Sequence, residues 1–229
     1  MSIKLNKNLL GNEELNGLIK VFKSGNVTQG KYCKLFEDKF AKKLNSKYAL
    51  FVNSGSSANL LSFFCMSNPL IRLNTKIKNR KFKKNSEVIV CGLSWSTTIW
   101  PIIQCGATPV FVDCDPSTLQ INEDQILKSI NKNTIAICVV HVLGNGPNIS
   151  LIKKICNKKK LWLIEDTCES LGAKYKSQSL GTFGDFGTFS FYFSHHITTI
   201  EGGMIITNNK HLYTVLKTMR AHGWTRDLE

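Results

Sequence analysis

Several side chains that could do chemistry directly follow short apolar runs. The first group is Ser54 to Ser57, which reads SGSS and leads into a segment with helical spacing. Small residues let backbone amides approach a ligand, and the free NH groups and positive dipole end of a helix start favour an anion. The stretch therefore suits a phosphate group, and a serine that simply caps the helix is the alternative.

Two further positions follow apolar runs in the same way. Trp95 comes shortly after EVIVC, and Asp166 ends LWLIED. An aromatic ring beside a crevice can stack on a planar ligand, although packing is the alternative. A carboxylate that ends a buried strand needs a cationic or NH partner, which a protonated pyridine, a helix start or an internal salt bridge would provide.

The stretch SFYFSHHITTIEGG, from Ser190 to Gly203, places His195 and His196 side by side in a polar turn. An imidazole has an ordinary pKa near 6.5, so it can take up and release a proton near neutral pH. A seat for a phosphate, a platform for a ring and a carboxylate for a ring nitrogen are together what pyridoxal phosphate requires.

The elements that must position these residues alternate between strands and helices. Segments with helical spacing, such as 57–66 and 149–160, separate several of the apolar runs. This alternation predicts an α/β fold with a doubly wound, mostly parallel sheet, in which ligands bind beyond the carboxyl ends of the strands. The predicted strands are Tyr48 to Asn53, Glu87 to Cys91, Thr108 to Asp113, Thr134 to Val142 and Leu161 to Asp166.

Composition limits the class of protein. A chain of 229 residues that is 42% hydrophobic can bury one globular core. It has no apolar window of about 18 residues and its start lacks the apolar region of a secretory signal, so we expect a cytoplasmic protein with no membrane partner. Its eight cysteines stand singly without a CxxC pair, which predicts buried thiols in a reducing compartment and no metal site.

The chain is strongly basic, with a formal net charge of +14. Its lysines are scattered, and the densest run, Lys76 to Asn85, is typical of a solvated loop. We therefore expect no nucleic-acid partner, and attraction of an anionic small molecule stays open.

Six motifs occur in the order typical of one known family: VNSGSSANLL, GLSWSTT, PVFVDCD, LIEDTCESLGA, GTFGDFGTFSFY and TTIEGGMIIT. From about Val27 to its last residues the sequence resembles the DegT/DnrJ/EryC1/StrS sugar aminotransferase family. The resemblance implies the large domain of the PLP-dependent, aspartate aminotransferase-like fold (fold type I). Residues 1–229 would form this cofactor-binding domain, and the family's small C-terminal domain is absent, which indicates a fragment. It also implies a homodimer.

The resemblance assigns a role to each candidate residue. The lysine to which the family bonds its cofactor falls on His195, and imidazole cannot form that bond. Pyridoxal or pyridoxamine phosphate (PLP or PMP) would therefore be held noncovalently, with His195 as the catalytic residue. The implied cofactor contacts are Asp166 with the pyridine nitrogen, Trp95 on the ring, Glu169 on the phenolic side, and Gly55, Ser56 and Ser190 with the phosphate. For His196 a packing or hydrogen-bonding role is expected.

A histidine in place of the lysine resembles a small dehydratase branch of the family. This implies removal of the C3 hydroxyl from a nucleotide-linked 4-keto-6-deoxy sugar, in deoxysugar and O-antigen biosynthesis, with glutamate as amino donor. No cysteine follows Cys168, which argues against the branch that carries an iron-sulfur cluster. A sugar aminotransferase that uses another lysine and a noncatalytic ligand-binding descendant are the alternatives, and the nucleotide and sugar stay open.

Overall fold

A computed structural model describes residues 10–72, 74 and 81–225 of the chain. Its main feature is a seven-stranded sheet in the order β1-β9-β8-β5-β4-β2-β3. These strands are β1 (Tyr48–Val52), β2 (Glu87–Cys91), β3 (Thr108–Val112), β4 (Thr134–Val140), β5 (Trp162–Asp166), β8 (Phe186–Ser190) and β9 (Gly203–Thr207). A separate hairpin pairs β6 (Lys174–Tyr175) with β7 (Gln178–Ser179).

The pairs β2–β3, β2–β4, β4–β5 and β5–β8 are parallel, whereas β9 runs antiparallel to both of its neighbours, β1 and β8. Six strands therefore end at one edge of the sheet, which we call the carboxyl edge, and β9 begins there. This confirms the predicted doubly wound, mostly parallel sheet.

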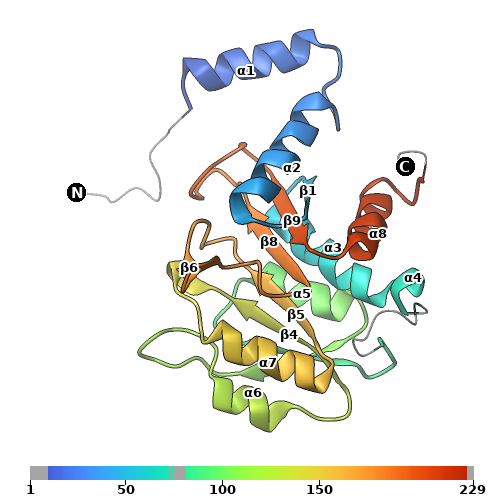
Figure 1. The fold of residues 1–229 in the computed structure, drawn as a ribbon, viewed down its shortest axis with the longest axis vertical. Helices are drawn as coiled ribbons and strands as arrows, with labels where there is room; N and C mark the ends of the chain where they lie inside the picture. The colour runs from blue at the N-terminus through green and yellow to red at the C-terminus, as the bar shows by residue number, and fades with distance from the viewer. Residues whose placement is uncertain (1–9, 73, 75–80, 226–229) are drawn as a thin grey trace.

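Helices cover both faces of the sheet, and Figure 1 shows α6 and α7 across the strands from α3 and α8. One hydrophobic cluster joins α3, α5 and α8 to the sheet, and two others join α6, α7 and α2 to its opposite face. The helices are α1 (Asn12–Lys23), α2 (Lys31–Leu44), α3 (Gly55–Ser67), α4 (Pro69–Arg72), α5 (Ser96–Gln104), α6 (Glu123–Ser129), α7 (Ile149–Lys159) and α8 (Lys210–Arg220), with a short 3-10 turn, η1 (Val142–Gly144).

All five predicted strands form, with ends that differ by at most two residues. The largest difference is at β4, which stops at Val140 before η1. The predicted helical segments lie in α3 and α7. Part of the basic run, residues 76–80, lies outside the described residues, and Lys81 to Asn85 form neither helix nor strand.

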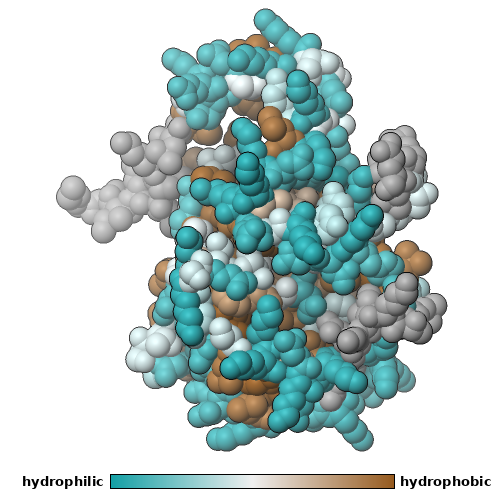
Figure 2. Space-filling view, viewed as in Figure 1, coloured by the Kyte–Doolittle hydropathy of each residue, from teal (hydrophilic) through white to brown (hydrophobic). Residues whose placement is uncertain are grey.

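Helix α1 stands apart from the sheet (Figure 1), and none of its residues is buried. Its apolar residues Leu15, Leu18, Ile19 and Phe22 recur at helical spacing and are exposed. Figure 2 shows hydrophilic residues over most of the viewed face, with hydrophobic residues exposed among them. Among the residues described, no helix has both the length and the apolar character that crossing a membrane requires.

The cysteines are free thiols. The expectation that they are buried is confirmed for Cys65, Cys91, Cys138 and Cys156 and is wrong for Cys33, Cys105, Cys114 and Cys168, which are partly exposed. These four lie on helix faces or in loops at the rim of the core. Even so, burial raises the pKa of the Cys105 thiol to about 11, which leaves it protonated at neutral pH.

The start of β9 lies directly against the start of α3. A Cβ atom added to Gly203 would collide with the Ser54 carbonyl and lie 2.7 Å from the Gly55 nitrogen. Both neighbours are backbone atoms, so no side chain can turn aside. The EGG motif thus has a packing reason: only glycine lets β9 begin this close to the α3 start.

We expect Gly203→Ala to lower the free energy of unfolding by about 2 kcal/mol or more, because the new methyl group forces two backbone segments apart. Chemical denaturation measures the change. Gly17→Ala is the control, since an added Cβ there meets nothing within 4 Å in the exposed helix α1 and alanine favours a helix over glycine. Equal stability of Gly203→Ala and the unmodified chain would contradict the close packing.

Candidate functional site

The first turn of α3 leaves two backbone donors open at the carboxyl edge. Ser54 caps the helix: its Oγ accepts from the Ser57 nitrogen at 3.0 Å, and its carbonyl accepts from the Ala58 nitrogen at 3.0 Å. Within the described chain, the amides of Gly55 and Ser56 have no acceptor. The cap and the phosphate seat are therefore compatible, because capping one donor leaves two NH groups at the positive end of the helix.

Gly55 brings this helix start against the end of β8. A Cβ on Gly55 would lie 2.6 Å from Cβ of Ser190 and 2.9 Å from Sγ of Cys168. The Ser190 Oγ accepts from the Tyr192 nitrogen at 3.3 Å. On the other side, Ser56 Oγ donates to Thr97 Oγ1 at 3.0 Å, which ties α3 to the start of α5. Gly55 and Ser190 thus lie in contact, and Ser56 follows Gly55 in the same helical turn. That the three hold a phosphate stays a prediction.

Asp166 ends β5 and is buried. Its Oδ2 accepts from Asn59 Nδ2 at 2.8 Å and from Thr98 Oγ1 at 2.7 Å, and its Oδ1 accepts from the Cys168 nitrogen at 3.2 Å. All three donors are neutral, so the alternative of an internal salt bridge is wrong for the described residues. A carboxylate oxygen has two lone pairs; beside Oδ1 stands only the weakly donating thiol of Cys168, so Oδ1 can accept from a stronger N–H donor.

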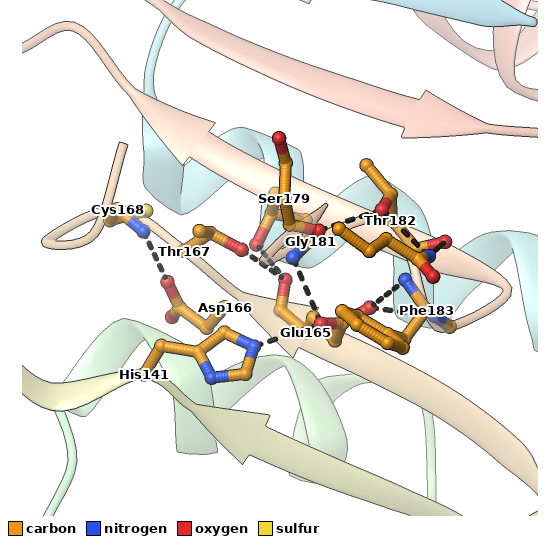
Figure 3. A network of polar contacts seen from close by, with 12 residues as sticks. His141, Glu165, Asp166, Thr167, Cys168, Ser179, Gly181, Thr182 and Phe183 are labelled. Carbon is orange, nitrogen blue, oxygen red and sulfur yellow. Dashed lines mark hydrogen bonds and ion pairs between the residues drawn. The ribbon is translucent and has the colours of Figure 1, made fainter. Parts of the chain in front are cut away.

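The neighbouring Glu165 points the other way, toward the loop that precedes β8 (Figure 3). Its Oε1 accepts from the nitrogens of Phe183 at 2.7 Å and Gly184 at 2.6 Å. Its Oε2 accepts from the Gly181 nitrogen at 2.9 Å and lies 2.9 Å from His141 Nε2. Glu165 is fully buried and its acceptor sites are filled by the protein, so it anchors the loop and does not face the crevice.

Trp95 immediately precedes α5 at the carboxyl edge, and its side chain is 71% exposed. The Trp95 carbonyl accepts from the Thr98 nitrogen at 3.0 Å. Trp95 therefore lies in the same turn as Thr98, whose hydroxyl donates to Asp166. An exposed indole is not core packing, so the packing alternative is wrong. Stacking on a ring stays a prediction.

His195 lies in the loop between β8 and β9 and is partly buried. Its nitrogen donates to the Tyr192 carbonyl at 3.0 Å. Burial lowers the pKa of its imidazole below the ordinary value, the negative charges of Glu169 and Asp166 oppose this, and the charge of His196 adds to it. The ring is therefore close enough to Asp166 and Glu169 to respond to their charges, and it is neutral at pH 7.

Two functional candidates were missed by sequence reasoning, namely Asn59 and Thr98, which hold Asp166. Thr98 stands in the motif GLSWSTT, and Asn59 is a polar residue inside the apolar helical segment SANLLSFFCM. A buried polar side chain needs a hydrogen-bond partner, so the polar Asn59 within an apolar segment could have indicated a buried polar contact. The sequence gives no indication of which strand end it contacts.

A hollow of about 230 Å³ lies at the opposite edge of the sheet, lined by residues that include Lys153, Asn157, Asp185 and Asn208. The amino ends of β5 and β8 lie there, so it is remote from the candidate site. In the part of the chain that the structure describes, no group of three or more histidine, cysteine or acidic residues could hold a metal ion.

This arrangement of strand ends is that of the aminotransferase-like fold. Residues 8–229 match the model of the DegT/DnrJ/EryC1/StrS aminotransferase family, and the chain belongs to that family. It is 44% identical over 216 residues, 94% of its length, to the GDP-4-keto-6-deoxy-D-mannose 3-dehydratase of Yersinia pseudotuberculosis, of which the match covers 53%.

Solved structures show the same likeness. The chain is 40% identical to an Escherichia coli GDP-4-keto-6-deoxy-D-mannose-3-dehydratase with bound hydrated PLP, at a TM-score of 0.90 that covers 100% of this chain and 57% of the other. A second such dehydratase structure, with a trapped PLP-glutamate geminal diamine, is 39% identical at a TM-score of 0.89 and has the same coverage. The chain thus spans about half the length of the relatives it matches.

We expect Glu165→Gln to lower the free energy of unfolding by about 2 to 4 kcal/mol. Glutamine has an NH2 group in place of one carboxylate oxygen. That group would face a backbone NH, so the NH2 group and the backbone NH would both lack an acceptor in the core. Thermal and chemical denaturation measure the loss. Glu87→Gln is the control, since Glu87 accepts one hydrogen bond from Asn131 near the surface, and a comparable loss there would contradict the special role of Glu165.

The charges around His195 predict opposite shifts for two variants. Glu169→Gln removes a negative charge that raises the pKa of His195, so that pKa should fall further. His196→Asn removes a positive charge that lowers it, so that pKa should rise. NMR titration of the His195 ring protons measures both changes. Shifts of the same sign, or none, would place the ring away from Glu169 and His196.

Proposed function

We propose that this protein catalyses the PLP/PMP-dependent removal of the C3 hydroxyl from a nucleotide-linked 4-keto-6-deoxy sugar, in deoxysugar biosynthesis for O-antigen. The observation that carries the proposal is the position of His195. By the resemblance of the stretch SFYFSHHITTIEGG, an imidazole, which cannot form a Schiff base with the cofactor, would stand where the family has its lysine. Its loop joins the carboxyl edge beside Asp166, and its pKa responds to that residue.

The residues at the carboxyl edge fit the cofactor. The open amides of Gly55 and Ser56 and the hydroxyl of Ser190 would hold its phosphate, where a Cβ on Gly55 would fill the cradle. Asp166 Oδ1 would accept the ring N–H. The exposed ring of Trp95 would cover one face, and Glu169 would lie on the phenolic side. All of these contacts would be noncovalent.

His195 would act as both base and acid. When bound, the pyridoxamine form of the cofactor would supply an acidic C4′ carbon and a ring that stabilises the electron pair left after its deprotonation, and that pair would expel the C3 hydroxyl. The lowered pKa of His195 leaves its ring neutral at pH 7, so it can take the proton from the C4′ carbon. The resulting imidazolium can then give that proton to the departing hydroxyl oxygen.

The partners follow from the same proposal. The substrate would be a nucleotide sugar, with a GDP-sugar favoured by the name of the Yersinia relative. Glutamate would restore the amino form of the cofactor, which is supported by the glutamate adduct in the solved dehydratase. We further propose a homodimer. The assignment of residues 1–229 to the large cofactor domain, without the small C-terminal domain, stays a prediction.

The test is to incubate the whole protein with PMP, glutamate and GDP-4-keto-6-deoxymannose. Mass spectrometry should show a sugar that has lost one oxygen atom, together with released ammonia. We expect His195→Asn to lower the rate by about 10² to 10⁴, because it removes the group that transfers the proton. His222→Asn is the control, since it changes a histidine in an exposed turn after α8.

Three results would overturn the proposal. An aminated sugar that keeps its C3 oxygen would identify an aminotransferase, and a borohydride-stable adduct on a lysine would show which residue it uses. A His195→Asn variant with the full rate would remove the histidine from the reaction. His195→Lys should acquire a borohydride-reducible link to the cofactor at position 195, and its absence would place that side chain outside the pocket.

A further inference from the structure

The two carboxylate oxygens of Asp166 are used differently. Oδ2 accepts two side-chain donors, Asn59 Nδ2 at 2.8 Å and Thr98 Oγ1 at 2.7 Å, which fill both of its lone pairs. Oδ1 accepts the backbone nitrogen of Cys168 at the longer distance of 3.2 Å, and the thiol of Cys168, a weak donor, also interacts with this carboxylate. The carboxylate is therefore fixed in rotation, and its remaining acceptor capacity belongs to Oδ1.

The amide of Asn59 is itself held in one orientation. Thr188 Oγ1 lies 2.6 Å from Asn59 Oδ1 and 3.3 Å from the Glu165 carbonyl. If the amide were flipped, its oxygen would face the Asp166 carboxylate, and two acceptors would oppose each other. The NH2 group must therefore point at Asp166, while the amide oxygen accepts from Thr188.

These side chains are isolated from water. Asn59 is 1% exposed, and Thr98 and Thr188 are 0% exposed. They come from α3, α5 and β8, so the orientation of one carboxylate depends on three elements that meet at the end of β5. Buried networks in which every member has a partner hold a unique geometry.

We propose that Asn59 is a positioning residue for the cofactor: supported by Thr188 and assisted by Thr98, it holds Asp166 so that Oδ1 receives the ring N–H. This inference rests on the proposed function. Asn59 touches neither the cofactor nor the substrate and acts only through Asp166. Without the amide donor, Oδ2 keeps Thr98 alone and regains a lone pair, so the carboxylate is held less firmly and Oδ1 is no longer fixed toward the ring nitrogen.

The test uses two ligands that differ at one atom: PMP and its 1-deaza analogue, which has a carbon in place of the ring nitrogen. The analogue cannot donate a hydrogen bond to Asp166, so the ratio of the two dissociation constants reports that bond alone. Titration of the unmodified chain, followed by fluorescence and ultraviolet absorbance, should show tighter binding of PMP. Asn59→Leu should weaken PMP binding on the order of tenfold and change analogue binding by less than about twofold.

Further variants separate positioning from folding. Ser62→Ala is the matched control, since Ser62 is buried in the same helix and its hydroxyl donates to the Ala58 carbonyl at 2.8 Å, away from Asp166. It should leave the ratio unchanged. In an Asp166→Asn background, Asn59→Leu should no longer alter the ratio. Thr188→Val, which removes the support of the amide, should shift the ratio in the same direction and serves if Asn59→Leu does not fold.

The outcomes are distinct. Equal weakening of both ligands by Asn59→Leu and Thr188→Val would show a merely structural role and overturn the positioning role while the proposed function stands. Unchanged dissociation constants for both ligands in both variants would do the same. If the unmodified chain binds neither ligand, or binds both equally, Asp166 does not hold a ring nitrogen, and both proposals fail.

Discussion

The structure depends on two consecutive carboxylates that must be satisfied at the end of one buried strand. Side chains alternate along β5, so Glu165 and Asp166 face opposite sides of the sheet. Glu165 takes its donors from the loop before β8 and from His141, and Asp166 takes its donors from α3 and α5. An unpaired carboxylate would be costly on either side, so each acidic residue forces its surroundings into one arrangement.

The consequence differs between the two faces. Every acceptor site of Glu165 is used within the protein, which makes it a structural anchor for the loop at Gly181 to Gly184. Asp166 has the weak thiol donor of Cys168 beside its remaining lone pair, and its neutral donors leave its negative charge without a cation in the described chain. Adjacent residues of the same chemical class thus divide into one that shapes the site and one that can serve a ligand.

Much of this arrangement could be predicted from the sequence, and the reason is topological. Continuous apolar runs marked β1 to β5, and parallel strands end at one edge, so Gly55, Trp95 and Asp166 were expected near one another. Helix α5 was not predicted, because STTIWPIIQ contains Pro101 and several β-branched residues that disfavour helix. Asn59 escaped because its partners, Asp166 and Thr188, are 107 and 129 residues away in sequence. No local pattern encodes such a pairing.

The antiparallel strand β9 explains why a single loop can carry the proton-transferring residue. Because β8 ends and β9 begins at the carboxyl edge, the loop between them leaves and returns there, closed by the Phe191 nitrogen donating to the Gly202 carbonyl at 2.8 Å. His195 in this loop is partly buried and lies near the charges of Glu169 and Asp166. Burial lowers its pKa by more than these charges raise it. A lysine amine at the same place has an ordinary pKa near 10.4, so it would be mostly protonated when free, and its neutral form could bond to an aldehyde. A neutral imidazole instead offers a free base at pH 7 and no covalent alternative, which is the chemistry that proton transfer to and from a noncovalent cofactor requires.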